Sequence, residues 1–217
     1  MLTRFCVVVA MGGFSLVELM LALSLGLTLS GVMLRGLVTE GQNGARFSRL
    51  LQERATQRRA LDLIKGDLAA AVAVSDRPEQ DPKACKLAGR QPVLHLTTSV
   101  GPITYALGAA PSAIWRGQVL MRCGPAFGLD GQLQPQTQPV NRVVLDALPA
   151  TAPPWEDCGA LSPALLRPLG PTPSLPLSIC LDASGNWAAI RLLRQVQDGP
   201  SGPGTRLTMI TAGRLAG

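Results

Sequence analysis

The stretch GGFSLVELM, residues 12–20, decides how this chain is organised. It leads into an apolar run with no charged residue between Leu19 and Leu34. At about 1.5 Å per residue, this run and the turn before it are long enough for a helix to cross a bilayer, which takes about 20 residues. Glu18 lies near the start of the run. A carboxylate in lipid costs on the order of 3 kcal/mol, so we expect Glu18 to have a partner or a purpose.

A cut between Gly13 and Phe14 would supply that partner. Phe14 would then carry a new α-amino group four residues before Glu18, and residues four apart lie on one face of a helix. A subunit that joins a bundle of such helices can offer its Phe14 ammonium group to the Glu18 carboxylate of a neighbour. This ion pair would offset much of the cost of holding either charge in lipid, and it would set the axial stagger of the subunits.

These residues resemble the processing site of type IV prepilins and of the pseudopilins of type II secretion. In that family a membrane peptidase cuts after the glycine, and the new N-terminal phenylalanine is N-methylated. The resemblance implies that Gly13 precedes the cut, that Phe14 is methylated and that Glu18 belongs to the assembly ion pair. It also implies the partners: the prepilin peptidase and methylase, the inner membrane and other pilin or pseudopilin subunits.

Residues 1–13 differ from the short, polar, basic leader that is usual in this family. They contain Arg4 and then the apolar run from Phe5 to Met11. An ordinary signal peptide has a similar basic start and apolar middle, so a signal peptide or a plain membrane anchor is the alternative interpretation. Loss of this leader would remove Arg4 and lower the net charge of +6 by one.

The whole chain predicts an α+β protein of the pilin kind. A long N-terminal helix, with a membrane half and an amphipathic half, is expected to pack on a small antiparallel β-sheet head domain. The expected divisions are a leader at 1–13, a transmembrane and assembly helix at 14–35, an amphipathic continuation at 36–75 and a β-rich head at 76–217.

Apolar residues recur at helical spacing from Arg46 to Val74, namely Leu50, Leu61, Ile64, Leu68 and Val72. Such a stripe suits a stalk helix in a filament and also a core helix of a globular head. A break at 75–78 is expected to end the helix. Each glycine in a helix costs about 1 kcal/mol relative to alanine, so we also expect a hinge or a frayed turn between Gly36 and Gly44.

Short β-prone segments follow Cys85 and predict an antiparallel meander on the helix. Ile103, Tyr105 and Leu107 alternate on one face of such a segment. Pro149–Pro176 contains eight prolines and is expected to be a long loop, with a short helical turn near 161–166. Segment 177–182 is expected to be a half-buried strand with Cys180 on its outer face. The expected strands are 93–97, 102–107, 114–116, 119–121, 141–148, 177–182, 186–193 and 205–211.

The head also resembles, over perhaps half its length, the larger minor pilins called PilW-like, which are related to J-type pseudopilins. The residues that carry this resemblance are Ile103–Leu107, Ile114–Arg116 and Leu63–Leu68.

Five cysteines suggest disulfide chemistry outside the cytoplasm. Cys6 lies in the leader, which leaves an even number in the mature chain and three possible pairings. A metal site is disfavoured because no CxxC spacing occurs and His95 is the only histidine. We expect His95 to be a strand residue with a local partner, and we expect no metal and no cofactor. The candidate disulfide residues are Cys85, Cys123, Cys158 and Cys180.

The chain is basic, and its densest charge cluster lies in the amphipathic helix. A basic balance can favour DNA or an acidic membrane surface, but without interleaved aromatics we interpret this cluster as a solvated face. A second set, on the expected strands, would form a basic patch if the strands aligned it. The first cluster is Arg46, Arg49, Arg54, Arg58, Arg59 and Lys65, set among Glu53, Asp62 and Asp67, and the second set is Arg116, Arg122, Arg142, Arg191 and Arg194.

The predicted function is that of a minor pilin or pseudopilin, a structural and assembly subunit near the tip of a type IV pilus or a type II secretion pseudopilus. The alternative from another class is a membrane-anchored binding module, for example one that captures DNA during uptake. An enzyme is not expected, because the chain contains no GxSxG, HExxH or phosphate-loop motif. The expected location is the inner membrane, with a single span and the head outside the cytoplasm, and then the filament.

Overall fold

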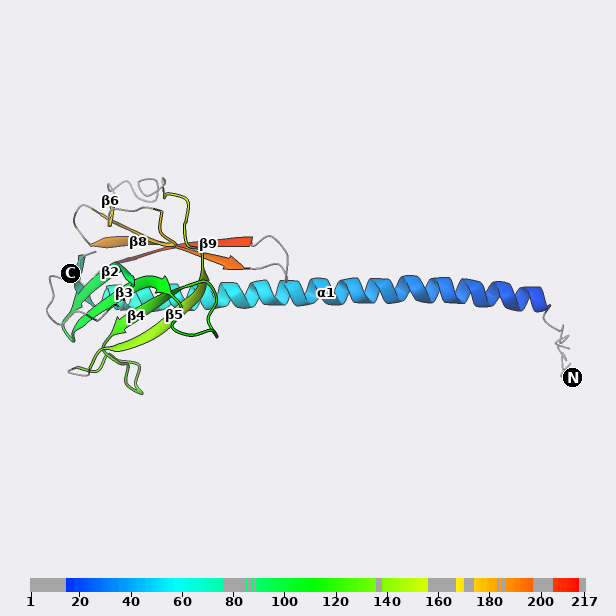
Figure 1. Cartoon of the computed structure of the whole chain (residues 1–217), viewed down its shortest axis with the longest axis horizontal. Coiled ribbons are helices and arrows are strands. Elements are labelled where there is room, and N and C mark those ends of the chain that lie inside the picture. The colour runs from blue at the N-terminus through cyan, green and yellow to red at the C-terminus, as the bar shows by residue number, and fades with distance from the viewer. Residues whose placement is uncertain are drawn as a thin grey trace, which may run out of the picture. The chain divides into compact units, whose positions relative to one another are not determined.

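The computed structural model describes residues 15–75, 85, 87, 89–135, 138–155, 167–169, 174–182, 184, 186–196 and 205–214. Within these residues the protein is α+β, with one long helix and nine antiparallel strands (Figure 1). The fold class predicted from the sequence is thereby confirmed. The chain forms two compact units, Met1–Arg49 and Leu50–Gly217.

In the first unit, helix α1 begins at Leu16, and every described residue as far as Arg49 is exposed. The described residues contain one helix long and apolar enough to cross a membrane, with a mean hydropathy of 1.9 over its 18-residue window. The frayed turn predicted between Gly36 and Gly44 is wrong, because α1 is regular there. Helix propagation explains this outcome: intact turns on both sides continue the hydrogen-bond ladder through a weak glycine, whereas fraying starts at helix ends.

In the second unit, α1 ends at Ala69, earlier than predicted, and β1 (Ala71–Ser75) follows almost at once. Ala71 is opposite Thr98, and Ser75 is opposite His95, in an antiparallel pairing with β2. Val72 lies on this strand and is 64% exposed, so it is not part of the helical stripe. Pairing of a β-prone AVAV segment with a neighbouring strand outweighs its weak helical pattern.

The first sheet has five strands in the order β1-β2-β3-β4-β5. Strands β2 to β5 form the predicted antiparallel meander, whereas β1 was not predicted. The segment 114–116 is not a strand, contrary to prediction; it forms the bends and turns between β3 and β4. Gly117 has a φ of 61° at this corner, and Asp130–Gly131 forms a turn, with a φ of 76° at Gly131. The remaining bounds are β2 Gln91–Thr98, β3 Pro102–Ala109, β4 Gln118–Gly124 and β5 Val140–Leu148.

The second sheet has the order β6-β7-β8-β9, built from β6 (Arg167–Pro168), β7 (Leu177–Leu181), β8 (Trp187–Val196) and β9 (Thr205–Arg214). Strand β7 was predicted to be half-buried, but both of its faces are covered. Cys180 does lie on the face opposite Ile179, where Trp155 and Ala189 pack against it. The predicted helical turn at 161–166 lies outside the described residues.

The core lies between the two sheets and the last turns of α1, with β4 and β5 on one side of these turns and β8 and β9 on the other (Figure 1). Leu61, Ile64 and Leu68 are buried on α1, as the stripe predicted, while Leu50 is only partly buried. Each fully buried Leu or Ile contributes about 1.5 to 3 kcal/mol to folding. The amphipathic part of α1 is therefore a core helix of the head.

Candidate functional site

The first turn of α1 holds the acid that the sequence analysis singled out. The Ser15 backbone N–H donates to Glu18 Oε2 at 3.3 Å, and the Val17 N–H donates to Ser15 Oγ at 3.4 Å. Ser15 therefore acts as the N-cap, and these two bonds satisfy backbone donors at the helix N-terminus in an arrangement close to a Ser-x-x-Glu capping box, with Val17 rather than Glu18 donating to the hydroxyl. The sequence motif was visible but was not interpreted as a cap. Gly13 and Phe14, the predicted cleavage and methylation residues, lie outside the described residues.

Two hydroxyl groups in the apolar part of α1 bond to the backbone of the same helix. The hydroxyl of Ser24 donates to the carbonyl oxygen of Leu21, and that of Thr28 donates to the carbonyl oxygen of Leu25, both at 2.9 Å. Such bonds remove most of the cost of placing a hydroxyl in a lipid or helix-bundle environment. This part of the helix therefore suits an apolar surround despite its serines and threonines.

A buried ion pair joins the end of α1 to the first sheet. The Arg122 guanidinium on β4 donates to Asp67 through Nε at 2.6 Å (Oδ2) and through Nη2 at 3.0 Å (Oδ1). The hydroxyl of Tyr105 on β3 donates to the same Asp67 Oδ2 at 2.5 Å. A third guanidinium bond, from Nη1 to the carbonyl oxygen of Pro125, measures 3.1 Å, and the Phe127 ring centroid lies 4.7 Å from Arg122 Cζ. The buried charges therefore have well-placed partners.

Electrostatics shift the pKa values of Tyr105 and Arg122 in this group. Burial, and then the charge of Asp67, raise the pKa of Tyr105 well above its ordinary value. Burial by itself would lower the pKa of Arg122, but the hydrogen bonds and charge of Asp67 outweigh it, and the pKa is raised. Tyr105 is therefore a neutral donor, and Arg122 is a permanent cation at physiological pH.

Two further polar contacts fix the same helix to the second sheet. Gln57 is fully buried on α1, and its Nε2 donates to the carbonyl oxygens of Leu192 at 2.7 Å and Leu207 at 3.2 Å. The Glu53 carboxylate, one turn earlier, forms an ion pair with Arg194 on β8. These contacts tie α1 to both β8 and β9.

Arg194 also connects the two sheets to each other. Its Nη2 donates to Asp146 Oδ1 on β5 at 2.8 Å, and its Nε donates to the Asp146 carbonyl oxygen at 3.2 Å. Asp146 in turn accepts the backbone N–H of Arg116 at 3.2 Å. The Arg116 side chain reaches Glu53 at 3.6 Å but is 64% exposed, so that surface pair contributes little. Arg194 on β8 thus links the second sheet to α1 through Glu53 and to the first sheet through Asp146.

Arg191 fastens the start of the proline-rich loop to the outer face of the second sheet. Its guanidinium donates to the carbonyl oxygens of Pro153 at 2.8 Å and Pro154 at 3.2 Å, and its Cζ lies 5.4 Å from the ring centroid of Trp155. Burial lowers the pKa of Arg191 from its ordinary value. The Arg191 guanidinium is bonded to loop carbonyls and packed against the Trp155 ring instead of being hydrated. The loop held in this way covers the outer face of the sheet, which explains why β7 is buried on both sides.

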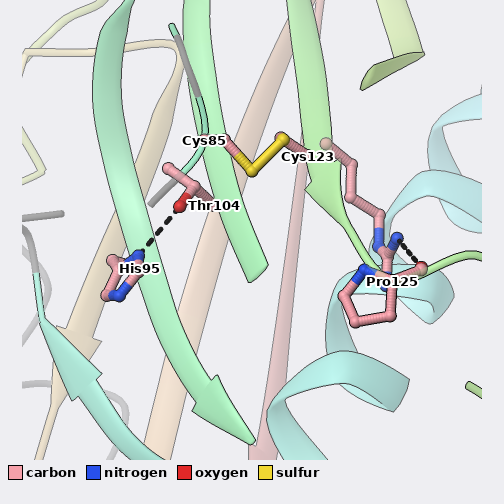
Figure 2. Close-up of a disulfide and its surroundings, with 6 residues drawn as sticks. Cys85, His95, Thr104, Cys123 and Pro125 are labelled. Carbon is pink, nitrogen blue, oxygen red and sulfur yellow. Dashed lines mark hydrogen bonds between the residues drawn. A yellow bond between two sulfur atoms is a disulfide. The ribbon is translucent and has the colours of Figure 1, made fainter. Parts of the chain in front are cut away.

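The cysteine prediction is confirmed for one pair. Cys85 and Cys123 form a disulfide with a Cα–Cα distance of 6.0 Å, shown in Figure 2. Cys180 is also disulfide-bonded, whereas Cys158 lies outside the described residues. His95 is a buried strand residue whose Nδ1 is 2.8 Å from Thr104 Oγ1, so the local partner expected for it is present (Figure 2).

The basic patch considered for the strands does not form. Arg122, Arg191 and Arg194 are buried and bonded inside the head, and only Arg116 and Arg142 are exposed. Within the described residues no group of three or more His, Cys, Asp or Glu side chains is placed to hold a metal ion.

Sequence reasoning missed the polar contacts that hold α1 in the head. One signal was available: Gln57 and Asp67 lie on the same helical face as Leu61, Ile64 and Leu68, where a polar residue needs a buried partner. The identity of those partners depends on strand order and could not be found from spacing. Comparisons with protein-family models, curated proteins and solved structures find no match to this chain.

Proposed function

We propose that this chain is a minor pilin or pseudopilin, an assembly subunit of a type IV pilus or of a type II secretion pseudopilus. The observation that supports this most is the construction of α1. The helix begins at a cap formed by Ser15 and Glu18, and it is exposed and uncharged from Leu19 to Leu34. Its last turns are buried in a β-rich head. The same helix thus carries an exposed apolar surface in the first unit and buried contacts with the head in the second unit.

The energetics suit a subunit that leaves lipid for a filament. The exposed apolar side chains of α1 need a lipid or helix surround, and a bundle of like helices can replace lipid contacts without exposing them to water. Release of Phe14 by cleavage would place an ammonium group beside the Glu18 cap. The proposed location is therefore the inner membrane, with a single span and the head outside the cytoplasm, followed by the filament.

The attachment of the helix to the head suits this role as well. A subunit that is pushed or pulled along a filament axis must pass force between its helix and its head. Buried polar contacts link α1 to strands of both sheets at three positions along the helix, namely Glu53, Gln57 and Asp67. Such polar contacts fix one position of the helix, which apolar packing alone does not do.

Mass spectrometry of the protein isolated from its host tests the proposal directly. We expect the mature chain to begin at Phe14 and to carry a methyl group on its α-amino nitrogen. A host strain without the prepilin peptidase is the control and should yield the unprocessed chain. A protein that retains residues 1–13 in the peptidase-positive host would rule out this function.

A further inference from the structure

We propose that the solvent-facing side of α1 in the head, with Arg54, Arg58 and Arg59, docks a carboxylate-rich helix of a different subunit. The proposal rests on the function proposed above and deepens it, because it names the chemistry of one neighbour in the assembly.

The structure leaves this face more basic than the sequence suggests. In the sequence the arginines are interleaved with Glu53, Asp62 and Asp67, as in a mixed, solvated surface. In the fold, the Glu53 carboxylate is 13% exposed and pairs with Arg194, and the Asp67 carboxylate is 2% exposed and pairs with Arg122. Asp62 is the acid that remains on the exposed face of this part of the helix.

Arg54, Arg58 and Arg59 are exposed, and within the described part of the chain they form neither a hydrogen bond nor an ion pair. Ala55, also exposed, lies among them and allows another backbone to approach closely. A guanidinium presents a planar fork of donors that matches a carboxylate. Three guanidinium groups within two helical turns form a binding surface for carboxylates that are themselves spaced along a helix.

A cleft continues this face toward the end of the helix. Asp62 and Gly66 line it on the α1 side, Phe127 and Leu133 line it on the other, and its volume is about 490 Å³. A Cβ placed on Gly66 would meet no atom within 4 Å, so the cleft is open at that point. From Arg58 to Gly66 the helix rises about 12 Å, so the bound helix is expected to place a large apolar side chain roughly two turns beyond its acids.

The observations favour a different subunit over other occupants. Arg54 follows Leu34, the last residue of the apolar run, by 20 residues along the chain, so the segment that suits lipid ends well before these arginines and lipid headgroups are a poor match. No aromatic residue occurs on the helix between Arg54 and Gly66 to stack a nucleic-acid base, and the ring of Phe127 in the cleft already packs against Arg122. The acids of α1 that are exposed, Glu18, Glu40 and Asp62, are too far apart to serve as the partner in a second copy.

The test uses the full chain in an assembling host, with the photoreactive residue benzoylphenylalanine in place of Ala55. We expect a crosslink to a helical peptide of another subunit that carries at least two Asp or Glu residues within two turns. The combined substitution Arg54→Glu, Arg58→Glu and Arg59→Glu should reduce this crosslink by at least about tenfold, since three attractive pairs become repulsive. Reversing the crosslinked acids to lysine should restore it.

The matched control combines Arg116→Glu, Arg142→Glu and Arg206→Glu, which reverses three exposed arginines that lie outside α1 and should leave the crosslink intact. Recovery of the Cys85–Cys123 disulfide by peptide mapping verifies that each variant is folded. A crosslink to lipid, to nucleic acid, to a second copy or to a peptide without acids would overturn the proposal. The proposal would also be overturned if the protein were processed and incorporated normally but gave no crosslink. The same holds if the crosslink were as strong in the Arg54→Glu, Arg58→Glu and Arg59→Glu variant as in the wild type. Missing cleavage after Gly13 would instead reject the pilin function itself.

Discussion

Asp67 near the end of α1 and Arg122 in the middle of β4 form a two-pronged ion pair, although 55 residues separate them in the chain. The Asp67 side chain is 2% exposed and that of Arg122 is 5% exposed. Moving charged groups out of water costs free energy, and only close, well-aligned partners offset that cost. The pair therefore specifies one arrangement of helix and sheet, and it is the natural first target for mutation.

Asp67→Ala should destabilise the head by about 3 to 5 kcal/mol, because Arg122 would become a buried charge with no carboxylate and Tyr105 would lose its acceptor. Urea unfolding of the full chain in detergent measures the loss. Asp62→Ala is the matched control, an exposed acid on the same helix that should change stability by less than about 0.5 kcal/mol. Equal effects of the two substitutions would contradict a stabilising role for the buried pair.

Tyr105 should titrate well above the ordinary tyrosine pKa of 10.0 in the folded protein. Because Tyr105 is the single tyrosine of the chain, the ultraviolet absorbance of tyrosinate reports this group alone. The folded state holds the proton more tightly than the unfolded state, so the stabilisation is complete below pH 10.0 and is lost as the pH rises toward the folded pKa.

Tyr105→Phe should flatten that alkaline loss of stability while costing about 1 to 2 kcal/mol near neutral pH. The protein unfolded in urea is the reference and should titrate near the ordinary value. A folded protein whose tyrosine titrates at the same pH as the unfolded chain would show that the hydroxyl is not held by Asp67.

Glu18→Ala should leave cleavage after Gly13 largely intact and should impair incorporation into filaments, because the neighbour's Phe14 ammonium group would have no counter-charge. Glu40→Ala is the control, an exposed acid of the same helix outside the apolar run. The mature N-terminus is read by mass spectrometry, and incorporation is read as the share of protein in sheared filaments.

Glu18→Gln separates the two roles of this residue. Glutamine can replace glutamate in a capping box but carries no charge. We therefore expect Glu18→Gln to resemble Glu18→Ala in incorporation. Wild-type incorporation of Glu18→Gln would assign the residue to helix capping and would exclude the ion-pair mechanism.

The Cys85–Cys123 bond closes a loop with a sequence separation of 38, so its loss in the double variant Cys85→Ser and Cys123→Ser should destabilise the head by about 4 kcal/mol on the chain-entropy estimate. A reductant also breaks the disulfide of Cys180 and should therefore destabilise the wild-type protein by more than this. With these two cysteines paired, Cys158 is the remaining partner for Cys180 in the chain after the predicted cleavage site. Peptide mapping under non-reducing conditions should recover a Cys158–Cys180 peptide, and any other pairing would contradict this assignment.

The sequence determined the features that depend on neighbours along the chain. The apolar run from Leu19 to Leu34 predicts a helix that suits lipid, since helix formation and hydrophobicity are local properties. The alternation of Ile103, Tyr105 and Leu107 placed one face of a strand correctly, and the order of β2, β3, β4 and β5 followed because consecutive strands tend to pair.

Only the tertiary structure decided where the helix ends and which charged side chains are buried and paired inside the head. The AVAV segment after Ala70 has a weak helical pattern, but a strand edge at Thr98 was available, and its hydrogen bonds made a strand of the segment. Arg122 and Arg194 look like surface cations in the sequence. Their burial follows from strand order, which brings Asp67, Glu53 and Asp146 to them, and no spacing along the chain encodes that proximity.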